Sequence, residues 1–144
     1  MTGEPVSAFY SGSPATGTIT SAFNVMTYGT VVKDSPGSSY SAGTWTCPIS
    51  GTYSIAAAID VSGTYAAANR TMIEIWVNGA AVARGSTFAG SSSTGNLLVP
   101  ASIHSYPILA GQTVQIKAFS EATSPVLTST VQNNFFSIVR TGNY

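Results

Sequence analysis

The chain has 144 residues, a length that suits one domain with a single hydrophobic core, and we expect one domain over residues 1–144. Its five Lys and Arg balance its five Asp and Glu, and charged residues make up only 7% of the sequence, where about a quarter is usual. This composition excludes nucleic-acid binding through a basic surface, because such binding needs many cations to neutralise phosphates.

Strand signals run along the whole chain. Ile and Val number 22 against four Leu, and side chains branched at Cβ favour strands. In chain order, we predict strands at Val6–Tyr10, Ala22–Tyr28, Gly43–Cys47, Tyr53–Val61, Thr71–Val77, Ala81–Gly85, Leu97–His104, Thr113–Phe119 and Phe135–Arg140.

Two of these runs carry the clearest patterns. Tyr53–Val61 alternates larger apolar side chains with small or polar ones, as a half-buried strand does. Thr71–Val77 ends at Asn78-Gly79, a strong hairpin signal because both central positions of a type I′ turn need positive φ. No segment keeps a helical period, and we interpret Tyr65–Asn69 as a loop. About ten short strands without helices predict an all-β, two-sheet antiparallel sandwich or barrel.

Residues that perform catalysis or bind metals are few and scattered. The chain has one histidine, His104, and one cysteine, Cys47, and its acids are separated from one another in the sequence. Asp60 and Glu74 could be neighbours if their strands pair, although exposed strand charges that keep edges soluble explain them equally well. Neither a nucleophile with an oriented base nor a set of three or four metal ligands can be assembled. We therefore expect no enzymatic activity, no metal site and no cofactor.

Three further features have ordinary interpretations. Asn69-Arg-Thr71 matches a glycosylation acceptor, which we interpret as accidental because no signal peptide is visible. Trp45 and Trp76 could stack on sugars, but an aromatic side chain on a strand more often lies in the core or in an interface. No stretch of 18 apolar residues predicts a membrane span.

The segment from Tyr40 to Ile55 resembles the signature of the globular heads of complement component one, subunit q. In that signature a Tyr, a Gly, an aromatic residue and a Cys precede Gly-x-Tyr-x-apolar, and here these are Tyr40, Gly43, Trp45, Cys47 and Gly51-Thr-Tyr53-Ser-Ile55. Further matching blocks are Ala8-Phe9, Phe23 to Tyr28, Ile73–Ala83, Leu97–His104, Ala110–Ile116 and Phe135–Val139. The resemblance implies the ten-stranded jelly roll shared with the tumour necrosis factor superfamily, packed as a tight homotrimer.

The resemblance also implies which residues lie near the threefold axis. It places the Gly-x-Tyr strand and the last strand there, so Tyr53, Phe135 and Phe136 are candidates for the trimer interface. The alternative, that all three belong to the core of one chain, stays open. The family's calcium sites need clustered carboxylates, which this chain lacks, so no metal site is carried over.

Two functions remain open at this stage. No collagen-like stalk or anchor precedes Met1, so we expect attachment through the folded domain: a trimeric decoration (cement) protein on the virion surface of a bacteriophage or other virus, with the major capsid protein as partner. The alternative is the carbohydrate- or receptor-binding head of a phage tail fibre, with a host glycan as ligand. A spore-surface or secreted bacterial member of the fold is a third possibility. Neither nucleic acid nor a membrane is expected as a partner.

Overall fold

The computed structural model describes residues 5–144, except for the side chains of residues 13–15. Within this range the regular structure consists of strands, and no helix is long and apolar enough to cross a bilayer. The strands are β1 (Ser7–Thr16), β2 (Asn24–Val25), β3 (Thr27–Asp34), β4 (Ser39–Ser41), β5 (Thr44–Thr46), β6 (Gly51–Tyr65), β7 (Arg70–Val77), β8 (Ala80–Phe88), β9 (Ser93–Ile108), β10 (Thr113–Ser120), β11 (Thr123–Leu127) and β12 (Phe135–Gly142).

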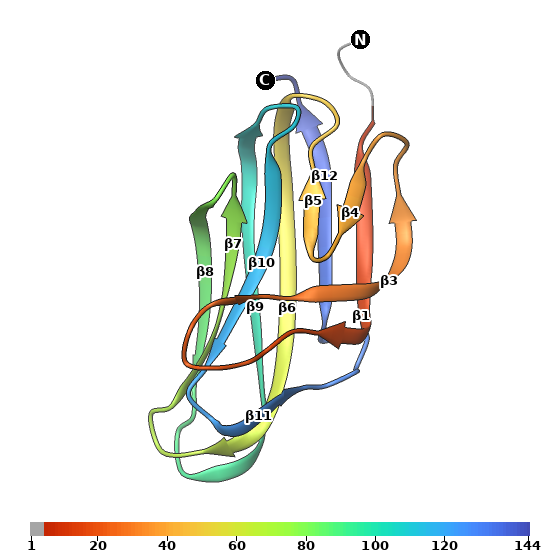
Figure 1. Cartoon of the computed structure of the whole chain (residues 1–144). Helices are drawn as coiled ribbons and strands as arrows, with labels where there is room; N and C mark the ends of the chain where they lie inside the picture. The colour runs from red at the N-terminus through yellow and green to blue at the C-terminus, as the bar shows by residue number, and fades with distance from the viewer. Residues whose placement is uncertain (1–4) are drawn as a thin grey trace.

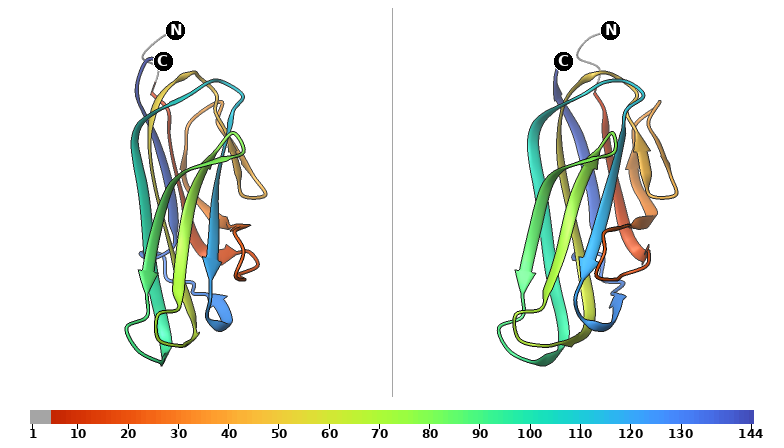
Figure 2. Two further views of the ribbon diagram at one scale, coloured as in Figure 1. Left: turned by 90° about the vertical axis from the view of Figure 1, so that its left-hand side faces the viewer. Right: turned by 60° about the vertical axis from the view of Figure 1, so that its left-hand side comes forward.

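Two antiparallel sheets pack face to face as a sandwich (Figures 1 and 2). Sheet A has the order β9-β6-β12-β1-β3, and β11 pairs with β6 beyond the end of β12. Sheet B has the order β4-β5-β10-β7-β8, and β2 pairs with β10. The chain crosses between the two sheets repeatedly, and neighbours within each sheet are mostly distant in the sequence, as in a jelly roll; the predicted two-sheet antiparallel class is confirmed.

Local sequence explains the two best-patterned strands. On β6, Tyr53, Ile55, Ala57, Ile59 and Val61 all face the space between the sheets and are buried, as their alternation predicts. Asn78 and Gly79 have φ of 49° and 83°, and Val77 pairs with Ala80 across them. The turn between β7 and β8 is therefore the predicted type I′ hairpin, in which both central residues adopt positive φ.

The core lies between the sheets and is rich in aromatic side chains. Phe136 packs against Tyr10, Tyr28 and Tyr40, with ring centroids 5.7, 6.4 and 5.9 Å away. Trp45 meets the ring of Tyr53 edge-on at 5.6 Å. Burial raises the pKa of the tyrosines Tyr10, Tyr28, Tyr40 and Tyr53 above the usual value, since a buried phenolate would lose its hydration.

Two strands, β4 and β11, and the second half of β3 were not predicted from the sequence. The second half of β3 is exposed on both sides, so its residues carry no alternating pattern. β4 has three residues, and β11 contains Pro125, a residue type that argues against a strand. The loop predicted at Tyr65–Asn69 is present as a turn over residues 66–69, which connects β6 and β7.

Residues 17–26 form a strap across the outer face of sheet B (Figure 1). The backbone N–H of Met26 donates to the carbonyl of Ile116, and the buried Met26 side chain lies against Gly17. Phe23 in the same strap packs on Phe119 of β10, with ring centroids 5.3 Å apart. The strap therefore covers part of sheet B, whereas the outer face of sheet A is covered at one border, by residues 128–134, and is open across its middle.

Candidate subunit interface

The outer face of sheet A, called here the sheet A face, is formed by outward side chains of β1, β12, β6 and β9. Across its middle, Phe9 lies opposite Ser137, Ser137 opposite Ala56, and Ala56 opposite Ser102. A second row places Ala58 between Phe135 and Pro100, and Val139 is exposed farther along β12. These positions carry no charge. Small and apolar side chains at such positions allow a second protein surface to approach the sheet closely.

Phe135, like its neighbour Phe9, is an aromatic side chain on the sheet A face. It is half-buried and stacks on Phe9 with ring centroids 5.6 Å apart and an interplanar angle of 11°. Phe135 also borders an open hollow of about 360 Å³, which is lined by Ala56, Ala57, Arg84, Pro100, Ala101, Ser102 and Phe135. The hollow offers room for a side chain of another molecule beside an aromatic wall.

The structure separates the three residues predicted for the trimer interface. Tyr53 and Phe136 are fully buried inside one chain, so their side chains have no surface left to bury against a partner. The Tyr53 hydroxyl donates to the carbonyl of Ile49 at 2.5 Å. Both residues therefore belong to the core of the protomer, the alternative that the sequence left open, because inward positions of β6 and β12 face sheet B. Only Phe135 lies on an open surface.

The buried carboxylate of Asp60 lies at one border of the sheet A face. Asp60 points outward from β6, yet it is buried because residues 128–134 fold over it and bond to it. One of its oxygens, Oδ2, accepts hydrogen bonds from Asn96, Thr128 and Asn133 at 3.0–3.2 Å. Asn134, also buried, accepts a bond from the Asp60 backbone N–H at 3.0 Å. This network ties the loop before β12 to the sheet and thereby positions Phe135.

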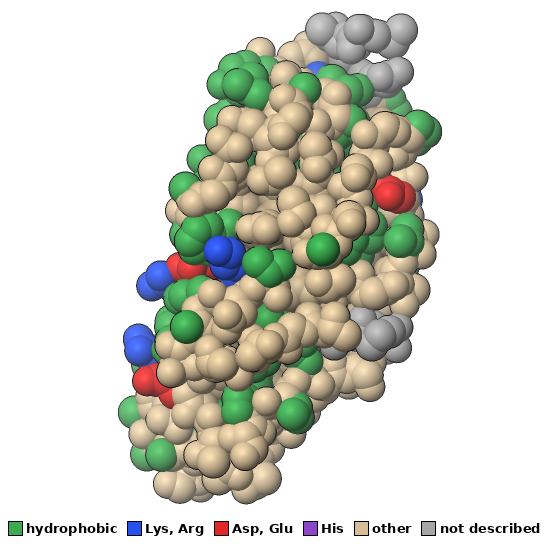
Figure 3. Space-filling view, viewed as in Figure 1, with side chains coloured by type: hydrophobic (Ala, Val, Ile, Leu, Met, Phe, Trp, Pro, Cys, Tyr) green, Lys and Arg blue, Asp and Glu red, His purple; other side chains and the backbone are tan. Residues whose placement is uncertain are grey.

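Charge gathers on the opposite side of the sandwich, the outer face of sheet B, which carries three of the chain's five Lys and Arg. Arg84 pairs with the buried Glu74, and Arg70 pairs with Glu121 at 2.9 Å. The hydrogen bonds from Arg70 lower the pKa of Glu121. Figure 3 shows this side, with blue and red side chains along the flank formed by β7 and β8 on a largely uncharged surface.

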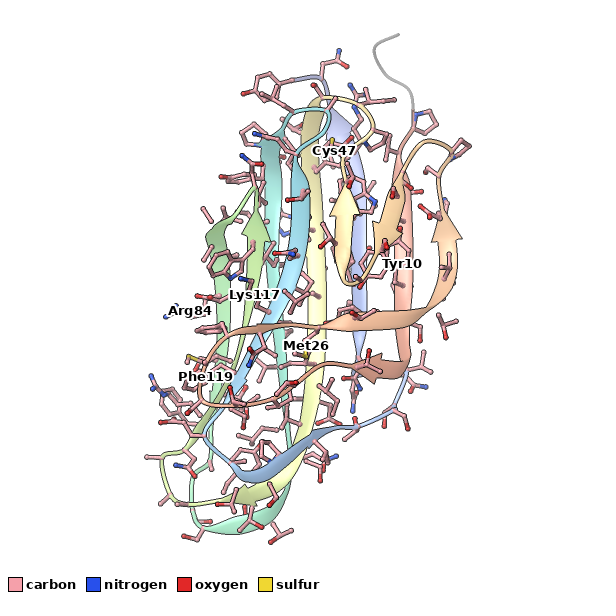
Figure 4. The ribbon with its side chains drawn as sticks, viewed as in Figure 1. Tyr10, Met26, Cys47, Arg84, Lys117 and Phe119 are labelled. Carbon is pink, nitrogen blue, oxygen red and sulfur yellow. The ribbon has the colours of Figure 1, made fainter. Side chains whose placement is uncertain are left out.

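Aromatic rings lie under each of these cations. Arg70 lies over Phe119 at 5.6 Å, Arg84 over Phe23 at 5.2 Å, and the Lys117 ammonium is 3.6 Å from the centre of the Trp76 ring. Figure 4 shows Lys117 and Phe119 along β10, with Arg84 at the outer edge of that flank. Each of these three cations therefore contacts an aromatic ring of the same chain, and both arginines also contact an acid. The charges on the outer face of sheet B have partners within the chain and lie in water.

The residues considered for catalysis or metal binding lie apart from one another in the fold. Asp60 and Glu74 lie on different sheets with outward side chains, so the possibility that they are neighbours is wrong. Cys47 is buried, its thiol donates to the carbonyl of Ile49, and burial raises the pKa of that thiol. His104 is exposed on β9. Within residues 5–144 no group of three His, Cys, Asp or Glu side chains is placed to hold a metal ion.

The structure also shows where the two tryptophans and the glycosylation-like triplet lie. Trp45 is fully buried in the core, whereas Trp76 is half-buried on the outer face of sheet B. Thr71, in the glycosylation-like triplet, is buried and its hydroxyl bonds to Tyr65 and Ser120. Sequence reasoning missed the contribution of Phe9 and of the alanines of β6 to the sheet A face. The run Ala56-Ala57-Ala58 carried a usable signal, because alanine on both faces of a strand permits close packing on each side.

Comparison with known proteins identifies the fold. No family model matches the chain, and no curated protein matches it in sequence. Among solved structures, the TNF protein Eiger of S. frugiperda superposes with a TM-score of 0.67 at 11% identity, over 97% of this chain and 94% of that one. Murine APRIL at pH 5.0 superposes with a TM-score of 0.61 at 9% identity, over 96% and 100% of the two chains. The chain therefore has the jelly-roll fold of tumour necrosis factor-like proteins.

Proposed function

We propose that the protein is a non-enzymatic structural protein that forms a homotrimer through the sheet A face. The observation that carries this proposal is the difference between the two outer faces of the sandwich. The sheet A face presents small and aromatic side chains around Phe135, whereas the outer face of sheet B holds paired charges and is partly covered by the strap. Protein interfaces bury uncharged centres and leave charged groups at the rim or in solvent.

Sedimentation of two matched variants tests the trimer. Phe135 and Phe119 are both half-buried phenylalanines on outward faces, one on each sheet. We expect the wild type and Phe119→Ala to sediment at three times the chain mass of 14.8 kDa, and Phe135→Ala to dissociate at the same concentration. Dissociation of both variants, or of neither, would contradict the assignment of the sheet A face.

For the biological role, we propose decoration of a virus capsid, with the trimer bound to the major capsid protein at threefold-related positions of the virion surface. Threefold symmetry lets three copies of one weak contact act together. The nearly uncharged, hydroxyl-rich surface supports a contact made by shape and hydrogen bonds, which high salt does not weaken. Capsids assembled without this protein should therefore bind it saturably, retain it in molar salt and become more resistant to heat. Release at modest ionic strength would argue against this role.

The shape of the sandwich favours one second candidate, the receptor-binding head of a tail fibre. The start of β1 and the end of β12 lie at one end, and the loops joining β6 to β7 and β8 to β9 lie at the other (Figure 1). A head held at its chain ends would present those loops to a host glycan. Binding of the purified protein to host cells or extracted envelope glycans, with no binding to capsids, would favour this candidate.

A further inference from the structure

One oxygen of the Asp60 carboxylate is buried without a hydrogen-bond partner. Asp60 is 1% exposed, and its Oδ2 accepts the three hydrogen bonds described above. Its Oδ1 is buried as well, yet it accepts no hydrogen bond from the described residues. Burial of a carboxylate oxygen without a partner costs the hydration that the oxygen has in the unfolded chain, so such an atom calls for an explanation.

Basic side chains lie far from this carboxylate. Neither of the two ion pairs found within residues 5–144 includes Asp60. Three of the chain's five Lys and Arg are on the outer face of sheet B, on the other side of the sandwich. Arg140 pairs with Tyr53, seven residues from Asp60 along β6 or about 23 Å, and Lys33 is on β3, three strands away. A buried negative charge without an opposite charge nearby is strongly destabilising.

Groups that carry oxygen ligands for a cation surround the carboxylate. Thr128 Oγ1 and the side-chain amides of Asn96 and Asn133 lie 3.0–3.2 Å from Asp60 Oδ2. Each amide can turn about its last side-chain bond and present Oδ1 in place of Nδ2. In a pentagonal-bipyramidal calcium site with Ca–O distances of about 2.4 Å, neighbouring ligand atoms are about 2.8–3.4 Å apart, which matches the observed spacing. Asn96 is exposed, so an ion can enter from water on that side.

We propose that Asp60, Asn96, Thr128 and Asn133 bind one Ca²⁺ ion within each chain. The carboxylate supplies the charge, the amides and the hydroxyl supply neutral oxygens, and water completes the coordination. Mg²⁺ fits less well, because it requires near-ideal octahedral geometry and keeps most of its water. The sequence gave no reason to expect this site, since its single acid is joined by neutral groups from β9 and from residues 128–134. The bound ion would fix the loop directly before Phe135, and the site does not depend on the proposed trimer.

A single carboxylate makes the affinity low, with a Kd of about 0.1–1 mM. At about 10 mM CaCl₂, such binding raises the Tm of a chain of this length by about 4–8 °C.

Thermal unfolding of protein freed of metal with EGTA tests the site. We expect CaCl₂ to raise the Tm of the wild type by the amount given above, and MgCl₂ or NaCl at the same ionic strength to have little effect. Asp60→Asn keeps the shape of the side chain but removes its charge, so its Tm should not respond to calcium. Asp34→Asn is the matched control, because it removes an exposed carboxylate from sheet A and should respond like the wild type. Equilibrium dialysis should find one bound calcium per wild-type chain and none in Asp60→Asn.

Asn96→Asp tests whether Asn96 is a ligand. Without calcium, the second carboxylate repels Asp60 and should lower the Tm below that of the wild type; with calcium, it is a charged ligand and should lower the Kd by at least about tenfold. If Asn96 only donated a hydrogen bond to Asp60, the Tm would be lower in both conditions and the Kd would not change, which would overturn the proposed ligand set. The proposal is also overturned if calcium leaves the wild-type Tm unchanged, if Asp60→Asn responds like the wild type, or if Mg²⁺ or Na⁺ produces the same rise.

Discussion

Truncation of Phe136 should destabilise the protomer strongly, in contrast to truncation of its neighbour Phe135. The Phe136 ring is fully buried among the rings of Tyr10, Tyr28 and Tyr40, so Phe136→Ala removes a whole ring from a packed space and leaves a cavity. Such changes lower the free energy of unfolding by about 3–5 kcal/mol. For a chain of this length, that corresponds to a fall in Tm of about 10–15 °C.

The assay is thermal unfolding of the wild type, Phe136→Ala and Phe135→Ala at one fixed protein concentration, with sedimentation of each. A fixed concentration is needed because the Tm of an oligomer depends on it. Phe136→Ala should unfold at a lower temperature while keeping its oligomeric state, and Phe135→Ala should change the oligomeric state. If Phe136→Ala kept the wild-type Tm, or dissociated without losing protomer stability, the placement of β12 with Phe136 inward would be refuted.

Three further predictions concern other parts of the fold. Gly85→Ala should lower the free energy of unfolding by about 3 kcal/mol because its Cβ would collide with the Pro100 carbonyl oxygen, whereas a Cβ at Gly90 meets nothing within 4 Å and Gly90→Ala should change it by less than about 0.5 kcal/mol. Chemical denaturation compares the two variants, and equal losses would contradict the close approach of β8 and β9. Asp60→Ala leaves the donors of Asn96, Thr128 and Asn133 without their acceptor and should lower the free energy of unfolding by about 2 kcal/mol, whereas Asp60→Asn keeps an acceptor oxygen and should lower it by less than about 1 kcal/mol. A reversed order in the same denaturation assay would refute the role given to Oδ2. The pKa values of four tyrosines are raised in the folded state, namely Tyr10, Tyr28, Tyr40 and Tyr53. The unfolded chain therefore loses their protons first, and the free energy of unfolding should fall above about pH 10 by up to about 1.4 kcal/mol per pH unit for each tyrosine. Denaturant midpoints that stay level up to about pH 11.5 would contradict their burial.

The sequence predicted those strands whose two sides meet different environments. On Tyr53–Val61 the larger apolar side chains alternate because one side faces the core, and at Asn78-Gly79 the turn requirement is local. The same reasoning failed for the second half of β3 and for β11. An edge strand with water on both sides has no alternation of apolar and polar residues to detect, and a proline within a segment argues against predicting a strand there.

The candidate site shows the same division. From the sequence, Tyr53, Phe135 and Phe136 were equivalent candidates, because residue type does not state which side of a strand faces the other sheet. Phe135 and Phe136 are adjacent in β12, and their exposure is decided by the register of β12 against β6, which sets Phe136 opposite Ala57 on the inner side and Phe135 opposite Ala58 on the outer side. A shift of one residue would exchange the two side chains.

By itself, the sequence determined the all-β class, the hairpin at Asn78-Gly79 and the small, balanced number of charges, since each depends on composition or on residues close in the chain. Tertiary structure alone decided that Asp60 is buried under residues 128–134, that Asp60 and Glu74 point away from each other, and that β3 is an open edge. Those features arise when strands distant in the chain are placed side by side, and the pairing of distant strands follows from the packing of the whole core rather than from any local pattern.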